Sequence, residues 1–214
     1  VKLACLGAAI TVALVGNTQA QPIMPDLSNV PTGWTTDRYA PNSFSNVGTF
    51  QGRDNVLGIG ISSAQNAASR GAQSAMFYNT QGKQHAVTGA AGASLSADLY
   101  IDAAWSSNTS GSVRSDMWGV MSDVDGVTDY PIIGFTNEGN NARYRVLDGD
   151  VPGGWIDLSS TAVNYGAWTS FKMVYTGGTN LEFFVNGSLV YTDTSIGYDL
   201  PSQSFSAVIM QAYN

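Results

Sequence analysis

The chain has 214 residues, of which 16 are acidic and 9 are basic, so its formal net charge is −7 at neutral pH. Charged residues make up 12% of the sequence, well below the typical quarter. The acidic balance excludes nucleic acid and anionic membrane surfaces as natural partners, because both carry negative charge themselves. A single histidine and a single cysteine exclude an ordinary zinc site, which needs four such ligands.

Residues 1–20 have the form of a secretory signal peptide. Lys2 precedes the apolar run Leu3–Val15, and Thr18-Gln19-Ala20 is a small-x-small cleavage site. The run is too short for a membrane helix, which needs about 20 apolar residues. We therefore expect a protein that is secreted, extracellular or at the cell surface, with no stable membrane span after cleavage. The mature domain, residues 21–214, would lack Cys5 and any disulfide.

Short apolar runs with a period of two residues follow along the mature chain. The clearest is Ser94–Trp105, in which Leu95, Leu99 and Ile101 alternate with polar side chains. Turn signals recur every 8–14 residues or so, as in a sandwich or barrel. The pattern predicts an all-β, two-sheet antiparallel sandwich of the jelly-roll type in a single domain. Further predicted strands are residues 57–61, 75–78, 117–121, 132–136, 143–147, 155–158, 169–175, 181–185, 189–192 and 206–213.

The single histidine, His85, lies in the segment YNTQGKQHAV together with Tyr78 and Gln81. Histidine, tyrosine and glutamine are the side chains with which jelly-roll polysaccharide lyases abstract a proton. The segment departs from the alginate-lyase pattern, since Gln84 is adjacent to His85 and the late strand IMQAYN lacks a lysine. Catalysis by His85, Tyr78 and Gln81 is therefore an alternative to a surface or loop histidine without a catalytic role.

Two groups of side chains are candidates for ligand binding. Asp98, Tyr100 and Asp102 share the polar face of the strand predicted at Ser94–Trp105. Arg143 and Arg145 flank Tyr144 and share one face of their own strand, and paired arginines suit planar anionic groups. Cross-strand ion pairs are the structural alternative for these arginines. We expect the two groups to form one binding face if their strands are neighbours.

Asp123, Asp125 and Asp129 form the pattern D-x-D-G-x-x-D around Gly126. Calcium takes six to eight oxygen ligands, and this segment offers three carboxylates together with backbone carbonyls. The segment lacks the remaining ligands of an EF-hand, so a metal-free turn rich in Asp and Gly is the alternative. Calcium is the one cofactor that the sequence indicates.

The segment Trp168–Thr192 reads as three strands joined by two tight turns. Asn186-Gly187 is a strong signal for a type I′ hairpin turn, which needs positive φ at both central residues. A two-residue loop would pair Phe183 with Val190 and place Leu181, Phe183 and Val185 in the core. The last predicted strand, residues 206–213, ends where the sequence ends. The C-terminus is therefore expected either to be truncated or to close the fold with this strand.

The segment WTSFKMVYTGGTNLEFFVNGSLVYT resembles the core of LamG-like, concanavalin A-type sandwiches. GWTTDRYAPNSF, GRDNVLGIGI, SADLYIDAAW and YPIIGF are similar to a group of secreted bacterial proteins, many of which end in a PEP-CTERM sorting tail. The given sequence shows no such tail, so we expect either a released protein or a sequence from which the tail is missing. The resemblance implies the jelly-roll fold and an extracellular location, and it supplies no catalytic residues.

Three functions remain open at this point. The first is a non-catalytic binding or adhesion module, monomeric, with a polysaccharide or glycan as its partner. The second is a polysaccharide lyase that uses His85, and the third is a structural protein of the cell surface or matrix. Glycosidases of this fold carry their carboxylates as E-x-D-x-x-E on one strand. Glu138 and Glu182 are the only glutamates, and neither lies in that pattern.

Overall fold

The computed structural model describes residues 21–23, 26–61, 80–109, 111–195 and 203–213. In these ranges nearly all regular structure is strand, interrupted by the short 3-10 helices η4 (Ala103–Ser106) and η5 (Glu138–Asn140). No helix in these ranges is long and apolar enough to cross a membrane. The strands are β1 (Gln21–Ile23), β2 (Trp34–Thr36), β3 (Ser43–Asn46), β4 (Leu57–Gly60), β5 (Gln81–Gly89), β6 (Ala93–Ile101), β7 (Arg114–Ser122), β8 (Val127–Asp129), β9 (Ile132–Thr136), β10 (Arg143–Leu147), β11 (Trp155–Asp157), β12 (Ala167–Gly177), β13 (Asn180–Val185), β14 (Ser188–Asp193) and β15 (Ser204–Tyr213).

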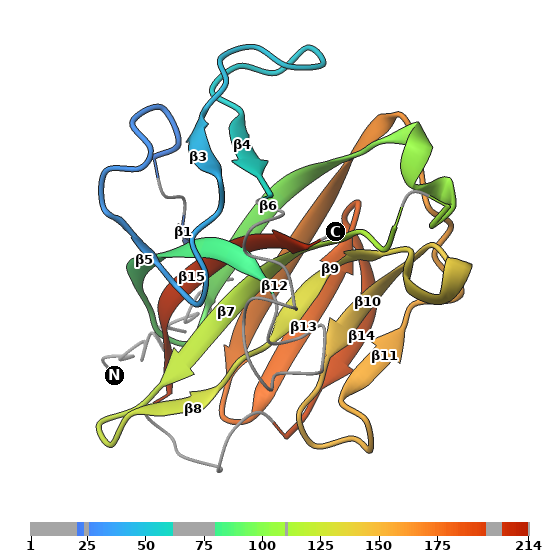
Figure 1. The fold of residues 1–214 in the computed structure, drawn as a ribbon. Coiled ribbons are helices and arrows are strands. Elements are labelled where there is room, and N and C mark those ends of the chain that lie inside the picture. The colour runs from blue at the N-terminus through green and yellow to red at the C-terminus, as the bar shows by residue number, and fades with distance from the viewer. Residues whose placement is uncertain (1–20, 24–25, 62–79, 110, 196–202, 214) are drawn as a thin grey trace, which may run out of the picture.

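The strands form two main sheets that face each other (Figure 1). The five-stranded sheet has the order β1-β6-β12-β13-β14. The eight-stranded sheet has the order β11-β10-β9-β7-β15-β5-β2, with β8 paired to β7. The hairpin β3–β4 stands apart from both sheets. Neighbouring strands are antiparallel except for β1, which runs parallel to β6. The predicted all-β antiparallel sandwich is therefore confirmed.

The core lies between the two sheets because each strand turns one apolar face inward. In β12 and β13 the inward residues Phe171, Met173 and Phe183 are 2% exposed or less. They meet Phe135 and Tyr144 of the eight-stranded sheet, and the rings of Tyr144 and Phe171 are 5.4 Å apart. Period-two alternation produces this arrangement directly, since successive side chains of a strand point to opposite faces.

The predicted strand Ser94–Trp105 was too long. β6 ends at Ile101, and Asp102 is the N-cap of η4, where its Oδ1 atom accepts a 2.8 Å hydrogen bond from the backbone N–H of Ala104. An aspartate side chain can accept a hydrogen bond from a backbone N–H and so begin a helix. The strand therefore ends before Asp102, although the apolar alternation continues to Trp105. The strands predicted at 132–136 and 143–147 coincide with β9 and β10.

The predicted hairpin is present, but its register differs by one residue. Asn186 and Gly187 both have positive φ, at 50° and 81°, as a type I′ turn requires. Val185 pairs with Ser188 as expected, whereas Phe183 pairs with Tyr191 and not with Val190, because a β-bulge interrupts the register. Such a bulge inserts one residue on one strand, which no turn rule predicts. Leu181, Phe183 and Val185 are nevertheless buried, as expected.

Strand β5 was missed, since its sequence QGKQHAVTG alternates weakly and looks like a loop. It pairs with β15 on one side and β2 on the other, so tertiary pairing makes it a strand. The strand predicted at residues 75–78 lies outside the described residues. The expected signal peptide, residues 1–20, also lies outside them.

Candidate functional site

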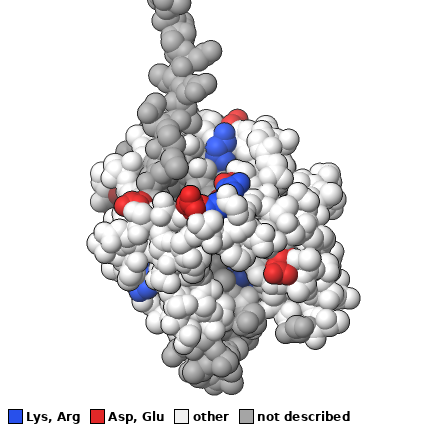
Figure 2. All heavy atoms as spheres, turned by 90° about the horizontal axis from the view of Figure 1, so that it is seen from above, with Lys and Arg blue, Asp and Glu red and all other residues white. Residues whose placement is uncertain are grey.

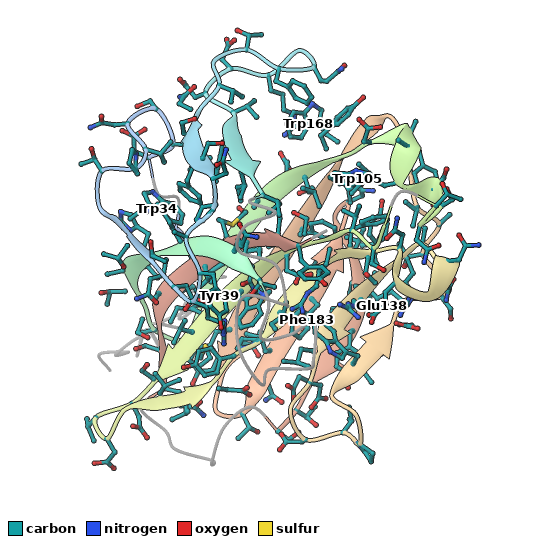
Figure 3. The ribbon with its side chains drawn as sticks, in the orientation of Figure 1. Trp34, Tyr39, Trp105, Glu138, Trp168 and Phe183 are labelled. Carbon is teal, nitrogen blue, oxygen red and sulfur yellow. The ribbon has the colours of Figure 1, made fainter. Side chains whose placement is uncertain are left out.

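A cavity of about 920 Å³ lies beside β6, mainly along the part that follows its pairing with β1 at Ala93–Leu95. One wall is the turn of the β3–β4 hairpin, and another is β6, which contributes residues of both its faces, together with Trp168 and Ser170 of β12. Side chains from β7 and β15 form its floor. Figure 3 shows Trp168 under the tip of the hairpin, with Trp105 below it to the right and Trp34 on the left, and all three line the cavity. Figure 2 looks onto this end, where charged side chains are few and the surface is mostly uncharged.

Three aromatic rings form a cluster at the mouth of this cavity. Tyr100 and Trp168 are neighbours on β6 and β12, with ring centroids 5.6 Å apart. Phe50 comes from the hairpin turn and meets both rings edge-on, at 5.3 and 6.2 Å. Trp168 also donates a 3.0 Å hydrogen bond from Nε1 to the carbonyl of Gln51, which fixes the turn on the sheet. Phe50 itself remains 41% exposed.

Charged groups lie next to the aromatic cluster. Arg53 places its guanidinium 4.7 Å from the ring centre of Trp168 and forms an ion pair with Asp98. Asp54 and Asp102 also line the cavity. The three residues predicted to bind a ligand from β6 and its end, Asp98, Tyr100 and Asp102, therefore all line one cavity. Sequence reasoning missed Phe50 and Arg53, because a hairpin turn carries no periodic signal that places it over a sheet.

Arg143 and Arg145 do not line this cavity, and the condition for one shared binding face, neighbouring strands, is not met. β10 lies in the eight-stranded sheet and β6 in the five-stranded sheet. Arg143 pairs with Asp157 at 2.6 Å and donates hydrogen bonds to the carbonyls of Glu138 and Asn141. A two-residue period identifies a shared face within one strand, but it does not identify the sheet.

Arg145 is part of a row of polar side chains on the outer face of the eight-stranded sheet, which we name the polar row. Cross-strand pairing places Gln211 beside Asp116, Asp116 beside Gly134 and Gly134 beside Arg145. Arg114 lies two residues before Asp116 on the same face of β7, and its Nε donates to Oδ2 of Asp116. All four residues, Arg114, Asp116, Arg145 and Gln211, are 3% exposed or less.

Several atoms of the polar row have no hydrogen-bond partner among the described residues. They are Oδ1 of Asp116, Nε of Arg145 and both amide atoms of Gln211. Leaving one buried polar group unsatisfied costs about 1–3 kcal/mol, so native proteins keep few such groups. The alternation R-S-D-M-W at residues 114–118 was a usable signal for this row. The predicted strand began only at Met117 and therefore left Arg114 and Asp116 out.

Burial also affects the charge of the polar row. It lowers the pKa of Arg145 to about 10, with Arg114 and Arg143 contributing repulsion while Asp116 and Glu138 partly offset it. The Arg145 guanidinium lies 3.8 Å from the ring centre of Trp155 and 3.5 Å from the exposed carboxylate of Glu138. Arg145 therefore remains cationic at neutral pH, and its guanidinium lies near the exposed side chain of Glu138.

Of the lyase candidates, the two within the described residues, His85 and Gln81, do not form an acid–base pair. His85 packs its ring 5.2 Å from that of Trp34 and bonds through Nδ1 to the carbonyl of Ala86 at 2.7 Å. Gln81 lies on the same face of β5, four residues away, which corresponds to about 13 Å along a strand. Tyr78 lies outside the described residues. The described geometry therefore gives no support to catalysis by His85.

The predicted calcium ligands occupy the hairpin between β7 and β8. Oδ1 of Asp123 accepts hydrogen bonds from the backbone N–H groups of Asp125 and Gly126, and Oδ1 of Asp129 accepts one from Tyr130. Within the described residues, the carboxylates that approach within 4.8 Å of one another belong to a different trio, Asp148, Asp150 and Asp193. Asp123, Asp125 and Asp129 are therefore not gathered around one point.

The comparisons with known proteins give distant matches in solved structures. A β-glucanase of Bacillus licheniformis is 15% identical, over 88% of this chain and 83% of that chain, with a TM-score of 0.43. A galectin of Caenorhabditis elegans is 12% identical, over 55% of this chain and 88% of that chain, with a TM-score of 0.22. No family model and no curated protein matches the sequence. Function is therefore inferred from the side chains of this protein.

Proposed function

We propose that this protein is a secreted, non-catalytic carbohydrate-binding module whose binding site is the cavity beside β6. The observation that carries the proposal is the combination of exposed aromatic rings and carboxylates around that cavity. Its volume, about 920 Å³, lies within the usual range of ligand pockets. The apolar faces of sugar rings pack on aromatic side chains, while their hydroxyl groups bond to charged and polar groups nearby.

The aromatic cluster supplies the apolar surface of this proposed site. Phe50 is 41% exposed, and Tyr100 and Trp168 are partly buried beside it. Aromatic rings provide large contact areas at a low cost in conformational entropy. Asp98 is held by Arg53 and Asp102 by the backbone of Ala104. The carboxylates are thus oriented before a ligand arrives, which favours binding.

The same carboxylates support a non-catalytic role. Hydrolysis of a glycosidic bond requires two carboxyl groups about 5–10 Å apart. Asp98 and Asp102 are four residues apart in extended chain, or about 13 Å. Each also has a structural partner, since Asp98 pairs with Arg53 and Asp102 caps η4. This pair therefore fits recognition of hydroxyl groups better than acid–base chemistry.

Binding of the purified domain to a broad glycan panel tests the proposal. We expect retention of at least one polysaccharide, and loss of that retention in Tyr100→Ala. Tyr130→Ala is the matched control, because Tyr130 is a tyrosine that is 38% exposed but lies outside the cavity. If the Tyr100→Ala variant still retains the polysaccharide, the binding site lies elsewhere in the protein. Failure of the whole panel would favour the structural role at the cell surface or matrix.

A second assay separates binding from catalysis. A lyase leaves an unsaturated uronate that absorbs ultraviolet light, and loss of its general base lowers the rate by about 10²–10⁴-fold. We expect no such product from alginate or pectin, and we expect His85→Ala to retain the glycan. A product that disappears in His85→Ala would make the protein a lyase.

Export remains a proposal on the basis of the sequence. If residues 1–20 are removed, the secreted protein begins at Gln21 and contains no cysteine. The intact mass of the protein recovered from the medium measures this directly. Soluble protein that retains Cys5 would contradict it.

Calcium binding at the hairpin of Asp123, Asp125 and Asp129 is likewise a proposal from the sequence. A cation that binds only the folded state raises the melting temperature by mass action. We expect calcium to raise the melting temperature of metal-stripped protein and Asp125→Asn to weaken that response. An unchanged melting curve at excess calcium would leave these residues as a turn.

A further inference from the structure

The cavity beside β6 has two parts, and the sugar contacts proposed above involve only one of them. Every residue from Leu95 to Tyr100 lines the cavity. Side chains of a strand alternate between its two faces, so the cavity extends along both faces of β6. We name these the outer part, which contains the aromatic cluster, and the inner part, which lies on the face of β6 that turns toward the eight-stranded sheet.

The two parts meet at an unpaired edge of β6. β12 pairs with one edge of β6 from Ser94 to Ile101, whereas β1 covers the other edge only at Ala93–Leu95. From Ser96 onward, no strand of the described chain pairs with this second edge. The backbone N–H and C=O groups of a strand point alternately to its two edges. A ligand that crosses this edge can therefore bond to the backbone of β6.

The side chains of the inner part are apolar and incompletely covered. Trp105 lines the cavity and stacks on the core ring of Phe135, with centroids 5.7 Å apart. The other members come from β4, β6, β15 and the residue before β7. All are half-buried and pack against the core, and they are Leu57, Ile59, Ala97, Leu99, Val113 and Met210. The inner part thus presents apolar side chains of both sheets to a space that these side chains do not fill.

The charged side chains that line the cavity lie outside the inner part. Arg53 and Asp54 belong to the hairpin turn, while Asp98 and Asp102 occupy outward positions on β6 and just after it. Arg114 also borders the cavity, but its guanidinium belongs to the polar row on the opposite face of its sheet. Within the described residues, the cavity is therefore polar around the aromatic cluster and apolar between the sheets.

A space of this chemistry favours an apolar ligand group. Protein interiors are otherwise close-packed, and water in an apolar space has few hydrogen-bond partners. Each methylene group that leaves water for such a space strengthens binding by about fourfold. A sugar without an apolar substituent would contact the outer part and would leave the inner part to water.

We propose that the ligand of this cavity is a glycolipid, with its sugar on the aromatic cluster and its alkyl or acyl chain in the inner part. The inference rests on the carbohydrate-binding function proposed above and specifies the class of carbohydrate that the cavity takes. The ligand crosses the unpaired edge of β6, where the oxygen atoms that link the chain to the sugar accept hydrogen bonds from backbone N–H groups.

Calorimetric titration of the full-length mature protein with methyl and octyl glycosides of glucose, galactose and mannose tests this inference. The octyl glycosides are kept below the concentration at which they form micelles. We expect the octyl glycoside of the preferred sugar to bind at least about tenfold more tightly than its methyl counterpart, since burial of two methylene groups already gives that factor. Octan-1-ol, which has the chain without the sugar, should bind more weakly than that octyl glycoside.

Variants of the inner part connect the chain to its position. We expect Ile59→Asn to lower the ratio of octyl to methyl glycoside affinity at least about fivefold, because a polar side chain replaces apolar contacts there. Ile156→Asn is the matched control, since Ile156 is also half-buried but lies on β11, outside the cavity. Ala97→Leu, which narrows the inner part without adding a polar group, should also lower the ratio. Tyr100→Ala should weaken both glycosides by the same factor and thus keep the ratio.

Three results would overturn the inference. Equal affinity for methyl and octyl glycosides would do so, and the proposed function would still stand if the glycan panel retains a polysaccharide. An equal fall of the ratio in Ile59→Asn and Ile156→Asn would show that the chain binds outside the inner part. Octan-1-ol that binds as tightly as the octyl glycosides, with no glycan retained by the panel, would reject the proposed function and the inference together.

Discussion

The hydroxyl of Tyr191 donates a 2.6 Å hydrogen bond to Oδ2 of Asp148 and thereby connects the two sheets. Tyr191 belongs to β14 of the five-stranded sheet, and Asp148 directly follows β10 of the eight-stranded sheet. Asp148 is 4% exposed, so its carboxylate depends on protein donors in place of water. The bond also raises the pKa of Tyr191 to about 12, with burial and the charge of Asp148 adding to it.

Tyr191→Phe is expected to lower the free energy of unfolding by about 1–3 kcal/mol, because it leaves a buried carboxylate oxygen without its donor. Urea unfolding followed by tryptophan fluorescence measures the change. Tyr165→Phe is the control, since the hydroxyl of Tyr165 has no hydrogen bond to the described residues. An equal loss in both variants would show that the bond between the sheets contributes nothing specific.

Asp193 gives the protein a pH dependence of defined sign. Burial raises the pKa of this carboxyl to about 6, opposed by hydrogen bonds from Ser195 and reinforced by Asp148 and Asp129. The folded state therefore holds a proton that the unfolded state has already lost between about pH 4 and pH 6. The free energy of unfolding falls as pH rises through that window, and the penalty is complete above it.

Asp193→Asn is expected to remove this penalty while keeping an acceptor for Ser195. The variant should gain on the order of 2–3 kcal/mol at pH 7 and nothing at pH 3.5. Asp150→Asn, an exposed neighbour, is the matched control. The free energy of unfolding of both variants is measured at a series of pH values. A gain in stability of the same size at pH 3.5 and pH 7 would contradict a raised pKa at Asp193.

Phe183→Ala tests the inward face of the C-terminal hairpin. Phe183 has no exposed surface, so its loss should lower the free energy of unfolding by about 3–5 kcal/mol through lost burial and a cavity. Leu189→Ala is the control on the outward face, because Leu189 is 54% exposed and should change stability by less than about 0.5 kcal/mol. Similar losses in both variants would refute the assignment of faces.

Gly187→Ala isolates the backbone conformation of the hairpin turn. Gly187 has a φ of 81°, and a Cβ atom there would meet nothing within 4 Å, so any cost comes from positive φ alone. We expect a loss of about 1–2 kcal/mol. At Gly149 an added Cβ meets only Oδ1 of Asp129, at 3.8 Å, so Gly149→Ala is the control and should be neutral or slightly stabilising.

Local sequence patterns were sufficient to predict many strands and the turn of the hairpin. β9 and β10 have the expected limits, because apolar alternation and turn residues act over a few positions. The bulge that shifts Phe183 onto Tyr191 was not predictable, since it depends on how β13 and β14 fit the twisted sheet. Strand β5 also escaped prediction, because its neighbours β2 and β15 make it a strand.

The candidate sites were likewise predictable from the sequence only in part. The sequence by itself placed Asp98 and Tyr100 on the polar face of one strand, because side chains alternate with a period of two. Only the tertiary structure decided that a turn 50 residues earlier places Phe50 and Arg53 over that face. It also decided that Arg145 belongs with Asp116 and Gln211, since strands distant in sequence become neighbours only when the sheet forms.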